Sequence, residues 1–318
     1  MTGSAEAAAI RGGAVTLAAA ADAFLSSPRV ASPNTHRAYT LVIDRLAAEL
    51  GQGRPLATVT GDEVAAALRR LWGGRSPATW NRNRAAVTSW LTWCATRKRW
   101  PAPQLPADAE RRKEHHDATR ALSRAAVERL LSRRDVPLRE KTLWRMLYET
   151  AARASEILAL NVEDLDLGQR RAPIRSKGGD TEYVYWDTGT ARLLPRLLRL
   201  PDGTTRTSGP LFLAHRKPVP ARRPAPRDIC PHTGRGRLGY DRARILFKAY
   251  TATAGGGLEL HQLRHSAATH LGDQHVPLQL IMAKTRHKSP RTAMRYIKPG
   301  ADAVAQITSL LGPPRRSN

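Results

Sequence analysis

Apolar residues recur three and four positions apart over most of this chain, and that spacing restricts the fold to one built mainly of helices. Between residues 172 and 186 the period changes to an apolar and polar alternation around a glycine turn, which is typical of a β-hairpin. We therefore expect a mainly α fold with a small β-sheet, and we expect Lys177 at the tip of its hairpin. One predicted helix face is formed by Tyr39, Val42, Leu46 and Leu50.

Residues 14–104 are expected to form a small all-helical domain behind a loose tail at residues 1–13. Asn34 or Thr35 is expected to cap one helix, and Thr60 with Glu63 forms a TxxE capping box ahead of another. An aromatic stripe at helical spacing is typical of a core, so we favour packing over base stacking for the tryptophans of the last helix. That apolar side consists of Trp80, Val87, Trp90, Leu91 and Cys94.

The same helix carries Arg82, Arg84 and Arg97 away from its apolar side. A basic face on a helical domain suits contact with DNA phosphates. We therefore expect these three arginines to bind DNA.

A linker is predicted at residues 105–119, because the chain from Pro101 holds three prolines and mixed charges without an apolar period. A hinge there would let two domains close around a rod-like ligand. The second domain is then expected over residues 120–318. Its stretch at 201–237, rich in Pro, Gly and Arg, is expected to be a long loop, either functional in touching DNA or disordered.

The formal net charge of +25 and the sequence pI near 11.3 indicate a polyanionic partner. Lys and Arg outnumber Asp and Glu by 16 to 10 through residue 117 and by 36 to 17 after it, so most of the excess, +19 against +6, lies in the second domain. A GC-rich genome that encodes arginine freely would account for part of this charge as solvated surface. The excess is nevertheless larger than solubility requires.

The two cysteines, Cys94 and Cys230, lie far apart in the sequence and favour a reducing cytoplasm without a disulfide framework. Cys230 with His232 resembles half of a zinc site, but no second ligand pair follows at suitable spacing, so we expect no metal. Arg11 and Asp22 interrupt the alanine-rich start, and no stretch approaches the ~20 apolar residues of a membrane span. We expect neither secretion nor a membrane partner.

Six side chains of the second domain stand out as a potential phosphate site. Three of the strings that contain them are TAARASEILALNVEDLD at 150–166, HQLRHSAATHL at 261–271 and RHKSPRTAMRY at 286–296. Taken singly, each residue is explained by packing or by a solvated surface, but the ordered combination is not. The six are Arg153, Lys177, His261, Arg264, His287 and Tyr296.

Elementary chemistry gives these residue types a purpose. The guanidinium groups of Arg153 and Arg264 can fork onto the nonbridging oxygens of a phosphodiester without a metal. A hydroxyl nucleophile such as Tyr296 forms a covalent phosphotyrosine that keeps the bond energy, so rejoining needs no ATP. His261 and Arg264, three residues apart, share a helical face. Glu156 either orients Arg153 or is an ordinary charge on a helix surface.

The strings resemble the signature boxes of the tyrosine recombinase, or phage-type integrase, family. These boxes are an arginine in a TGLRxSEL-like stretch, a lysine in a hairpin, an HxLRH box and a tyrosine nine residues past a histidine. Here 177 − 153 = 24, 264 − 261 = 3, 287 − 264 = 23 and 296 − 287 = 9, all close to the family's intervals. The likeness covers roughly residues 120–300 and implies a helical SAM-like core-binding domain followed by an α+β catalytic domain.

The sequence departs from the family pattern in three places. Arg286 stands where the family usually has a glycine, the TGLR stretch reads TAAR, and the segment between Lys177 and His261 is long. None of these removes a reactive group, so they bear on the subfamily and leave the chemistry intact.

The resemblance implies a role for each reactive residue. Tyr296 would attack a DNA phosphate to leave a 3′-phosphotyrosine, and Lys177 would protonate the departing 5′ oxygen. His261 would accept or orient the tyrosyl proton, and His287 would hydrogen-bond the scissile phosphate. Lys288 would contact DNA.

The resemblance also implies the partners. These are double-stranded DNA, a homo-tetramer assembled on two DNA sites and, optionally, an accessory DNA-bending protein, with no cofactor and no metal. An apolar stripe at Val304, Ile307 and Leu311 would form a C-terminal helix able to dock on a neighbouring subunit.

Two other functions fit part of these observations. A type IB topoisomerase shares the chemistry but reseals one duplex, whereas a recombinase joins two. The helical domain ahead of the catalytic one and the apolar C-terminal stripe favour the recombinase. A non-catalytic DNA-binding protein is the other alternative, but it would not need all six reactive positions to be filled.

Overall fold

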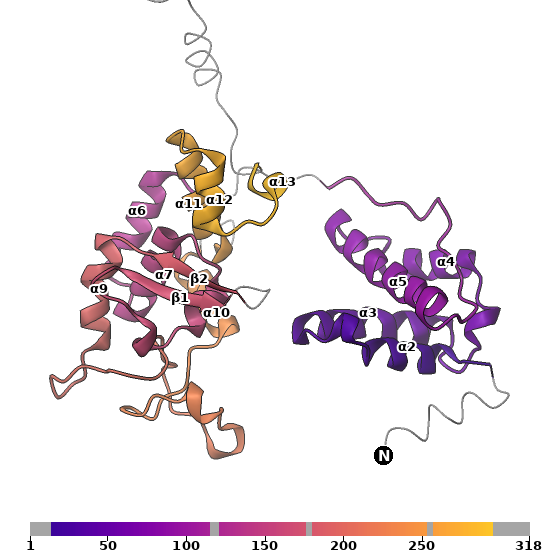
Figure 1. Cartoon of the computed structure of the whole chain (residues 1–318), viewed down its shortest axis with the longest axis horizontal. Coiled ribbons are helices and arrows are strands. Elements are labelled where there is room, and N and C mark those ends of the chain that lie inside the picture. Colours follow the sequence, from indigo (N-terminus) through magenta and orange to yellow (C-terminus); the bar gives the residue numbers. More distant parts are fainter. Residues whose placement is uncertain (1–13, 115–120, 176–179, 253–256, 295–318) are drawn as a thin grey trace, which may run out of the picture. The chain divides into compact units, whose positions relative to one another are not determined.

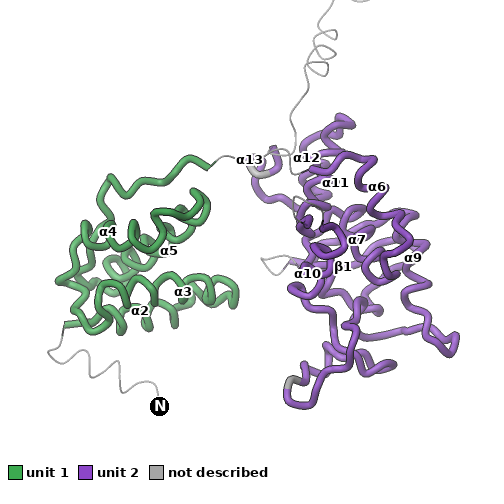
Figure 2. Tube along the Cα trace, turned by 180° about the vertical axis from the view of Figure 1, so that it is seen from behind, with its two compact units in different colours: residues 1–116 green, residues 117–318 purple. Residues whose placement is uncertain are grey.

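The structure, a computed structural model, describes residues 14–114, 121–175, 180–252 and 257–294, without the side chains of Arg222 and Thr292. Its Cα trace divides into two compact units, residues 1–116 and 117–318 (Figure 2). The predicted tail and the predicted C-terminal stripe lie outside the described residues. The fold is mainly helical with one small sheet, as predicted. Among the described helices, none combines the length and apolarity needed to cross a bilayer.

The first unit is a helical bundle in which α3 packs against α2, α4 and α5. Trp80 and Trp90, predicted to be core residues, are 3% and 0% exposed. The indole N–H of Trp90 donates to the carbonyl of Ala20 at 3.2 Å, so its one polar atom is satisfied inside the core. The elements are α2 (Leu17–Leu25), η1 (Pro28–Val30), α3 (Pro33–Leu50), η2 (Leu56–Thr58), α4 (Gly61–Trp72) and α5 (Pro77–Arg97) (Figure 1).

The helix starts of this unit confirm one prediction and correct another. At α4 the capping box is complete, because the Glu63 N–H donates to the Thr60 hydroxyl at 3.2 Å and the Thr60 N–H donates to the Glu63 carboxylate at 2.8 Å. The expectation that Asn34 or Thr35 caps the preceding helix is wrong. That helix, α3, already begins at Pro33, since proline has no N–H to lose in a first helical turn.

Residues 101–114, which include the start of the predicted linker, pack against the first unit. The indole N–H of Trp80 donates to the carbonyl of Glu110 at 2.8 Å. The Nε of Arg84 donates to the carbonyl of Ala109. Arg84, expected on the basic outer face, is therefore half-buried and holds this segment.

The second unit surrounds α7, which packs against α6, α8, α9, α11 and β2. Its core includes Trp144, which is 1% exposed. The helices α11 and α12 lie at one end of the unit (Figure 1). Its longer elements are α6 (Arg124–Ser132), α7 (Leu138–Thr150), α8 (Ala154–Ala159), β1 (Arg171–Arg175), β2 (Thr181–Tyr185), α9 (Thr188–Leu198), α10 (Tyr240–Tyr250), α11 (His261–Asp273) and α12 (Leu278–Thr285), and the shorter ones are η4 (Val162–Asp164) and α13 (Pro290–Ala293).

The predicted hairpin is present as an antiparallel pair of strands. Arg171 lies opposite Tyr185, and Arg175 lies opposite Thr181, in the two-stranded sheet of β1 and β2. The turn that contains Lys177 lies outside the described residues.

The beginning of the second unit is bonded to α11. The Leu122 N–H donates to the Ser266 hydroxyl at 2.9 Å, and the Leu122 carbonyl accepts from Nε2 of His270 at 2.8 Å. Because that nitrogen carries the proton, Nδ1 of His270 accepts from the Tyr148 hydroxyl, at 2.8 Å. Burial lowers the pKa of His270, which suits this neutral form. Three segments of the chain are thus fixed to one another.

The stretch at residues 201–237 has little regular structure, as predicted, apart from η5 (Pro220–Arg222) and η6 (Pro226–Asp228). It is anchored by Arg206, which is 4% exposed and donates to the carbonyls of Pro210 and Leu211, both at 2.9 Å. These bonds satisfy both Nη atoms of the buried arginine.

Candidate phosphate-binding site

Arg153 is placed by the tight connection between α7 and α8. Ala151, which follows α7, has a left-handed backbone with φ 50°, and Arg153 is the N-cap residue of α8. Glu156 accepts from the Arg153 N–H at 2.8 Å and from its Nη1 at 2.7 Å. The Arg153 side chain remains 50% exposed. Of the two roles left open for Glu156, the structure therefore contains the orienting contact.

Arg264 joins α11 to the two other parts of the site. It is 1% exposed, although it carries a charge. Its Nη1 donates to the carbonyl of Ala151 at 2.6 Å, and its Nη2 donates to Nε2 of His287 at 3.0 Å. One guanidinium thus binds the α7–α8 turn and His287, two residues past the end of α12.

The partners of His287 determine its tautomer. A guanidinium can only donate, so Nε2 of His287 accepts and Nδ1 carries the proton. Nδ1 then donates to the Thr285 hydroxyl at 2.7 Å, and that hydroxyl donates to the carbonyl of Ile281 at 2.6 Å. Burial, followed by the charges of Arg264 and Arg153, lowers the pKa of His287 to about 4. The ring is neutral at neutral pH.

His261 has a similar electrostatic environment. Desolvation, followed by the charges of Arg264, His265 and Arg153, lowers the pKa of His261. The charges of both arginines thus act on both imidazoles. The result is a site with two fixed cations and two neutral rings, which suits an anion and leaves a base for proton transfer.

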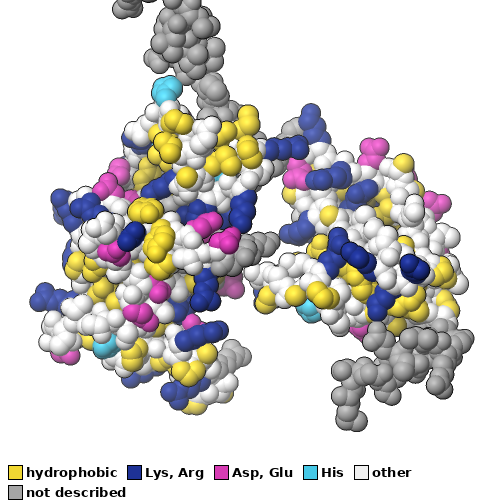
Figure 3. Space-filling view, viewed as in Figure 1, with side chains coloured by type: hydrophobic (Ala, Val, Ile, Leu, Met, Phe, Trp, Pro, Cys, Tyr) yellow, Lys and Arg dark blue, Asp and Glu magenta, His cyan; other side chains and the backbone are white. Residues whose placement is uncertain are grey.

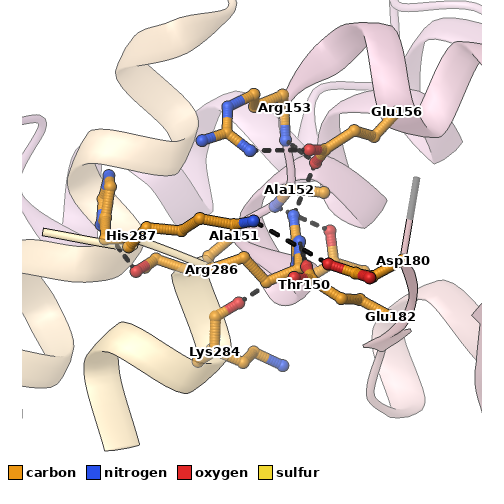
Figure 4. A network of polar contacts seen from close by, with 12 residues as sticks. Thr150, Ala151, Ala152, Arg153, Glu156, Asp180, Glu182, Lys284, Arg286 and His287 are labelled. Carbon is orange, nitrogen blue, oxygen red and sulfur yellow. Dashed lines mark hydrogen bonds and ion pairs between the residues drawn. The ribbon is translucent and has the colours of Figure 1, made fainter. Parts of the chain in front are cut away.

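Arg286 is an additional member of this site that the sequence did not identify as functional. Its Nη2 donates to Glu156 at 2.6 Å, and its Nε lies 3.5 Å from a carboxylate oxygen of Glu182 on β2 (Figure 4). Glu156 therefore lies between Arg286 and Arg153. Burial alone would raise the pKa of Glu156, but the Arg153 N–H and the two guanidinium groups lower it below its ordinary value. The sequence signal was the arginine at a position where the family usually has glycine.

Four of the six predicted residues come together in the structure, while Lys177 and Tyr296 lie outside the described residues. The four are Arg153, His261, Arg264 and His287.

The predicted DNA contacts are distributed over both units. Arg82 and Arg97 are exposed on α5, and Lys288 is 70% exposed with its Nζ 4.0 Å from Asp180. Lys and Arg side chains are spread over the face of each unit drawn in Figure 3. Among the described residues, no three His, Cys, Asp or Glu side chains are grouped as metal ligands would be.

Comparison with known protein families gives two matches. Residues 120–302 match the model of the phage integrase family. Residues 22–98 match the N-terminal SAM-like domain of phage integrases. Together the two matches include nearly every described element of both units.

Curated relatives are similar over most of the chain. A tyrosine recombinase XerC of Roseiflexus castenholzii is 29% identical over 290 residues, which is 86% of this chain and 85% of the relative. A tyrosine recombinase XerC of Mycobacterium tuberculosis is 29% identical over 292 residues, which is 86% of this chain and 91% of the relative.

Solved structures share the fold at lower sequence identity. The Tn1549 transposon integrase in complex with circular intermediate DNA matches 93% of this chain and 99% of its own, with 16% identity and a TM-score of 0.69. A lambda integrase dimer bound to a COC′ core site matches 89% of this chain and 77% of its own, with 16% identity and a TM-score of 0.66.

Proposed function

The chain belongs to the phage integrase family, and from this premise we propose that it is a site-specific DNA recombinase that cleaves and rejoins strands through a 3′-phosphotyrosine. The observation that carries the proposal is the cluster in which Arg264 bonds to His287 and the charge of Arg153 acts on the same ring. Double-stranded DNA is its partner in this proposal. Two solved structures with the same fold are complexes with DNA.

The scissile phosphate is expected to meet Arg153 first, because this side chain is half exposed whereas Arg264 is buried. Two guanidinium groups would then share the negative charge that develops in the transition state. In the structure, Nε2 of His287 accepts a hydrogen bond from Nη2 of Arg264. A phosphate nearby would raise the pKa of His287, so that Nε2 gains a proton and donates to a phosphate oxygen.

Tyr296 is the proposed nucleophile, supported by its interval of nine residues from His287. Its phenolic proton would pass to His261, whose lowered pKa leaves the ring neutral and able to accept. The phenolic oxygen bonds to phosphorus as the bond to the 5′ oxygen breaks, and Lys177 supplies a proton to that oxygen. Attack by a 5′ hydroxyl of another strand reverses the step and exchanges strands. No metal or ATP takes part in this scheme.

We propose that the two units have different roles in recombination. Residues 14–104 would be the core-binding domain and residues 120–318 the catalytic domain, with 105–119 between them. We propose that Arg82, Arg84, Arg97 and Lys288 contact DNA. We also propose a homo-tetramer on two DNA sites, optionally with an accessory DNA-bending protein.

The nucleophile is tested with the DNA site that the protein enriches from random-sequence duplexes. A nick beside the cleavage position lets the short 5′ hydroxyl strand diffuse away and so traps the covalent adduct. The wild type is expected to form the adduct in EDTA, and Tyr296→Phe is expected to bind the site and form none. The matched control is Tyr240→Phe on α10, where the tyrosine is 47% exposed, and it should react like the wild type. An adduct with Tyr296→Phe would assign the nucleophile elsewhere.

The same DNA site distinguishes a recombinase from the two alternatives, a type IB topoisomerase and a non-catalytic DNA-binding protein. A recombinase joins two differently labelled duplexes, whereas a type IB topoisomerase relaxes one supercoiled circle and leaves the labels separate. A non-catalytic DNA-binding protein gives neither product. The match to the SAM-like domain over residues 22–98 favours the recombinase.

A further inference from the structure

Arg286 has a backbone conformation that an arginine rarely adopts. It is the C-cap residue of α12, with φ 55° and ψ 46°, in the left-handed region where glycine is favoured. A side chain in this region is strained, and such strain persists only where surrounding contacts maintain it. The contacts of the Arg286 side chain should therefore explain why an arginine stands here.

Those contacts are ionic and shielded from solvent. The Arg286 side chain is 6% exposed, and it reaches Glu156 at 2.6 Å and Glu182 at 3.5 Å. Its Nη1 also donates to the carbonyl of Lys284 at 3.2 Å. A shielded guanidinium between two acids is held in place, because moving it away would leave buried charges without their partners.

The charge balance around Glu156 shows what this contact changes. Glu156 is 12% exposed and binds both Arg153 and Arg286. With Arg153 alone, one acid would cancel one base, and the guanidinium would offer a phosphate little net charge. Arg286 lies closer to Glu156, at 2.6 Å, than to the more exposed Glu182, at 3.5 Å, so its charge acts mainly on Glu156. Glu156 then neutralises less of the charge of the half-exposed Arg153 side chain.

Arg286 also connects this centre to the hairpin. Glu182 lies on β2, opposite Ile174 of β1. A second link joins the same elements, since Nζ of Lys284 donates to the carbonyl of Tyr185 at 2.8 Å. The end of α12 and the strand that follows the hairpin turn are therefore held together by two cations.

We infer that Arg286 is a positioning residue for strand cleavage: it draws on the charge of Glu156 so that Arg153 can bind the scissile phosphate, and its contact with Glu182 on β2 holds the Arg286 side chain in place. This inference rests on the proposed function. It assigns a purpose to the arginine that replaces the family's usual glycine.

The first experiment compares Arg286→Gly with Arg170→Gly. Arg170 is a matched control, because it also has a left-handed backbone, with φ 51°, but it is exposed and pairs with Asp187. Single-turnover adduct formation on the nicked site should slow about 10- to 100-fold in Arg286→Gly, with DNA affinity within about threefold of the wild type. Arg170→Gly should react like the wild type. An unchanged rate in Arg286→Gly would overturn the inference.

A double-mutant cycle tests whether Arg286 acts through Glu156. Glu156→Gln removes the negative charge that Arg286 balances, so adding Arg286→Gly to Glu156→Gln should slow cleavage by no more than about threefold. A purely structural role predicts the same slowing in both backgrounds, and that outcome would contradict the inference.

Arg286→Lys keeps a positive charge but cannot fork between two acids. It is expected to react at a rate between those of the wild type and Arg286→Gly, and it replaces Arg286→Gly in both experiments if that variant does not fold. A wild-type rate for Arg286→Lys would contradict the inference. If the wild type itself forms no adduct, the proposed function fails. If wild type and variants react alike, only the role of Arg286 fails.

Discussion

The two units place their arginines differently. Among residues 14–114 no arginine is buried, and the buried polar side chains are Ser27, Asn81 and Asn83. The second unit buries Arg206 and Arg264, and it shields the side chain of Arg286.

We expect the exposed arginines to set the DNA affinity and the buried arginines to set the geometry of the reactive site. An exposed arginine attracts phosphates without fixing their position, and it costs little to fold. A buried arginine must have each donor satisfied, so its position is determined by the surrounding atoms. We therefore expect changes in the first unit to affect mainly DNA affinity, and changes at the buried arginines to affect mainly cleavage.

The largest expected effect is that of salt on DNA affinity. With about 6 to 10 phosphates contacted, affinity should fall about 10³- to 10⁵-fold between about 50 and 200 mM salt. Arg82→Ala and Arg97→Ala should each reduce the slope of log affinity against log salt by about one, with little change in the cleavage rate at saturating DNA. Fluorescence anisotropy across a salt series measures both slopes. A nearly flat curve for the wild type would contradict the assignment of DNA as partner.

Removal of Arg264 should cause the next largest effect. Arg264→Ala leaves the Ala151 carbonyl and the His287 ring without their shared donor, so adduct formation should fall about 10²- to 10³-fold. The free energy of unfolding should fall by about 3 kcal/mol in urea titrations. The control is Arg206→Met, which removes another buried arginine and should lower stability while leaving the cleavage rate of the folded protein unchanged. Equal cleavage rates for Arg264→Ala and Arg206→Met would contradict the prediction that Arg264 acts in cleavage and Arg206 does not.

The smallest effect concerns stability against pH. The pKa of His287 is about 4 in the folded protein against an ordinary value of 6.5, so the unfolded chain binds more protons between these values. The free energy of unfolding should fall as pH drops through this window and level off below it. Allowing for solvent around the half-buried ring, this residue should contribute about 1 to 2 kcal/mol of the fall. Urea titrations of His287→Gln should show a shallower pH dependence, and an equally steep one would contradict the assignment.

Local patterns predicted the helices and the hairpin, whereas the resemblance to a known family predicted that the four reactive residues act together. The spacing of His261 and Arg264 is a property of one helix, and the capping box at Thr60 is contained in four residues. Such features depend on neighbours in the chain, which the sequence displays directly.

Long-range contacts were not predictable in this way. Arg286 and Glu156 are 130 residues apart, and the Arg84 bond to the Ala109 carbonyl depends on how a proline-containing segment returns to its own domain. No spacing rule connects such pairs. The start of α3 differs from the prediction for a local reason, because Pro33 suits the first helical turn and begins the helix ahead of Asn34.

The bonds of Leu122 have a mechanical consequence. Its N–H and its carbonyl are tied to Ser266 and His270, which lie two and six residues after Arg264 on α11. A force on the chain at Leu122 would therefore be transmitted to α11 through these two hydrogen bonds. Such a force would act on α11, the helix that positions the buried guanidinium of Arg264.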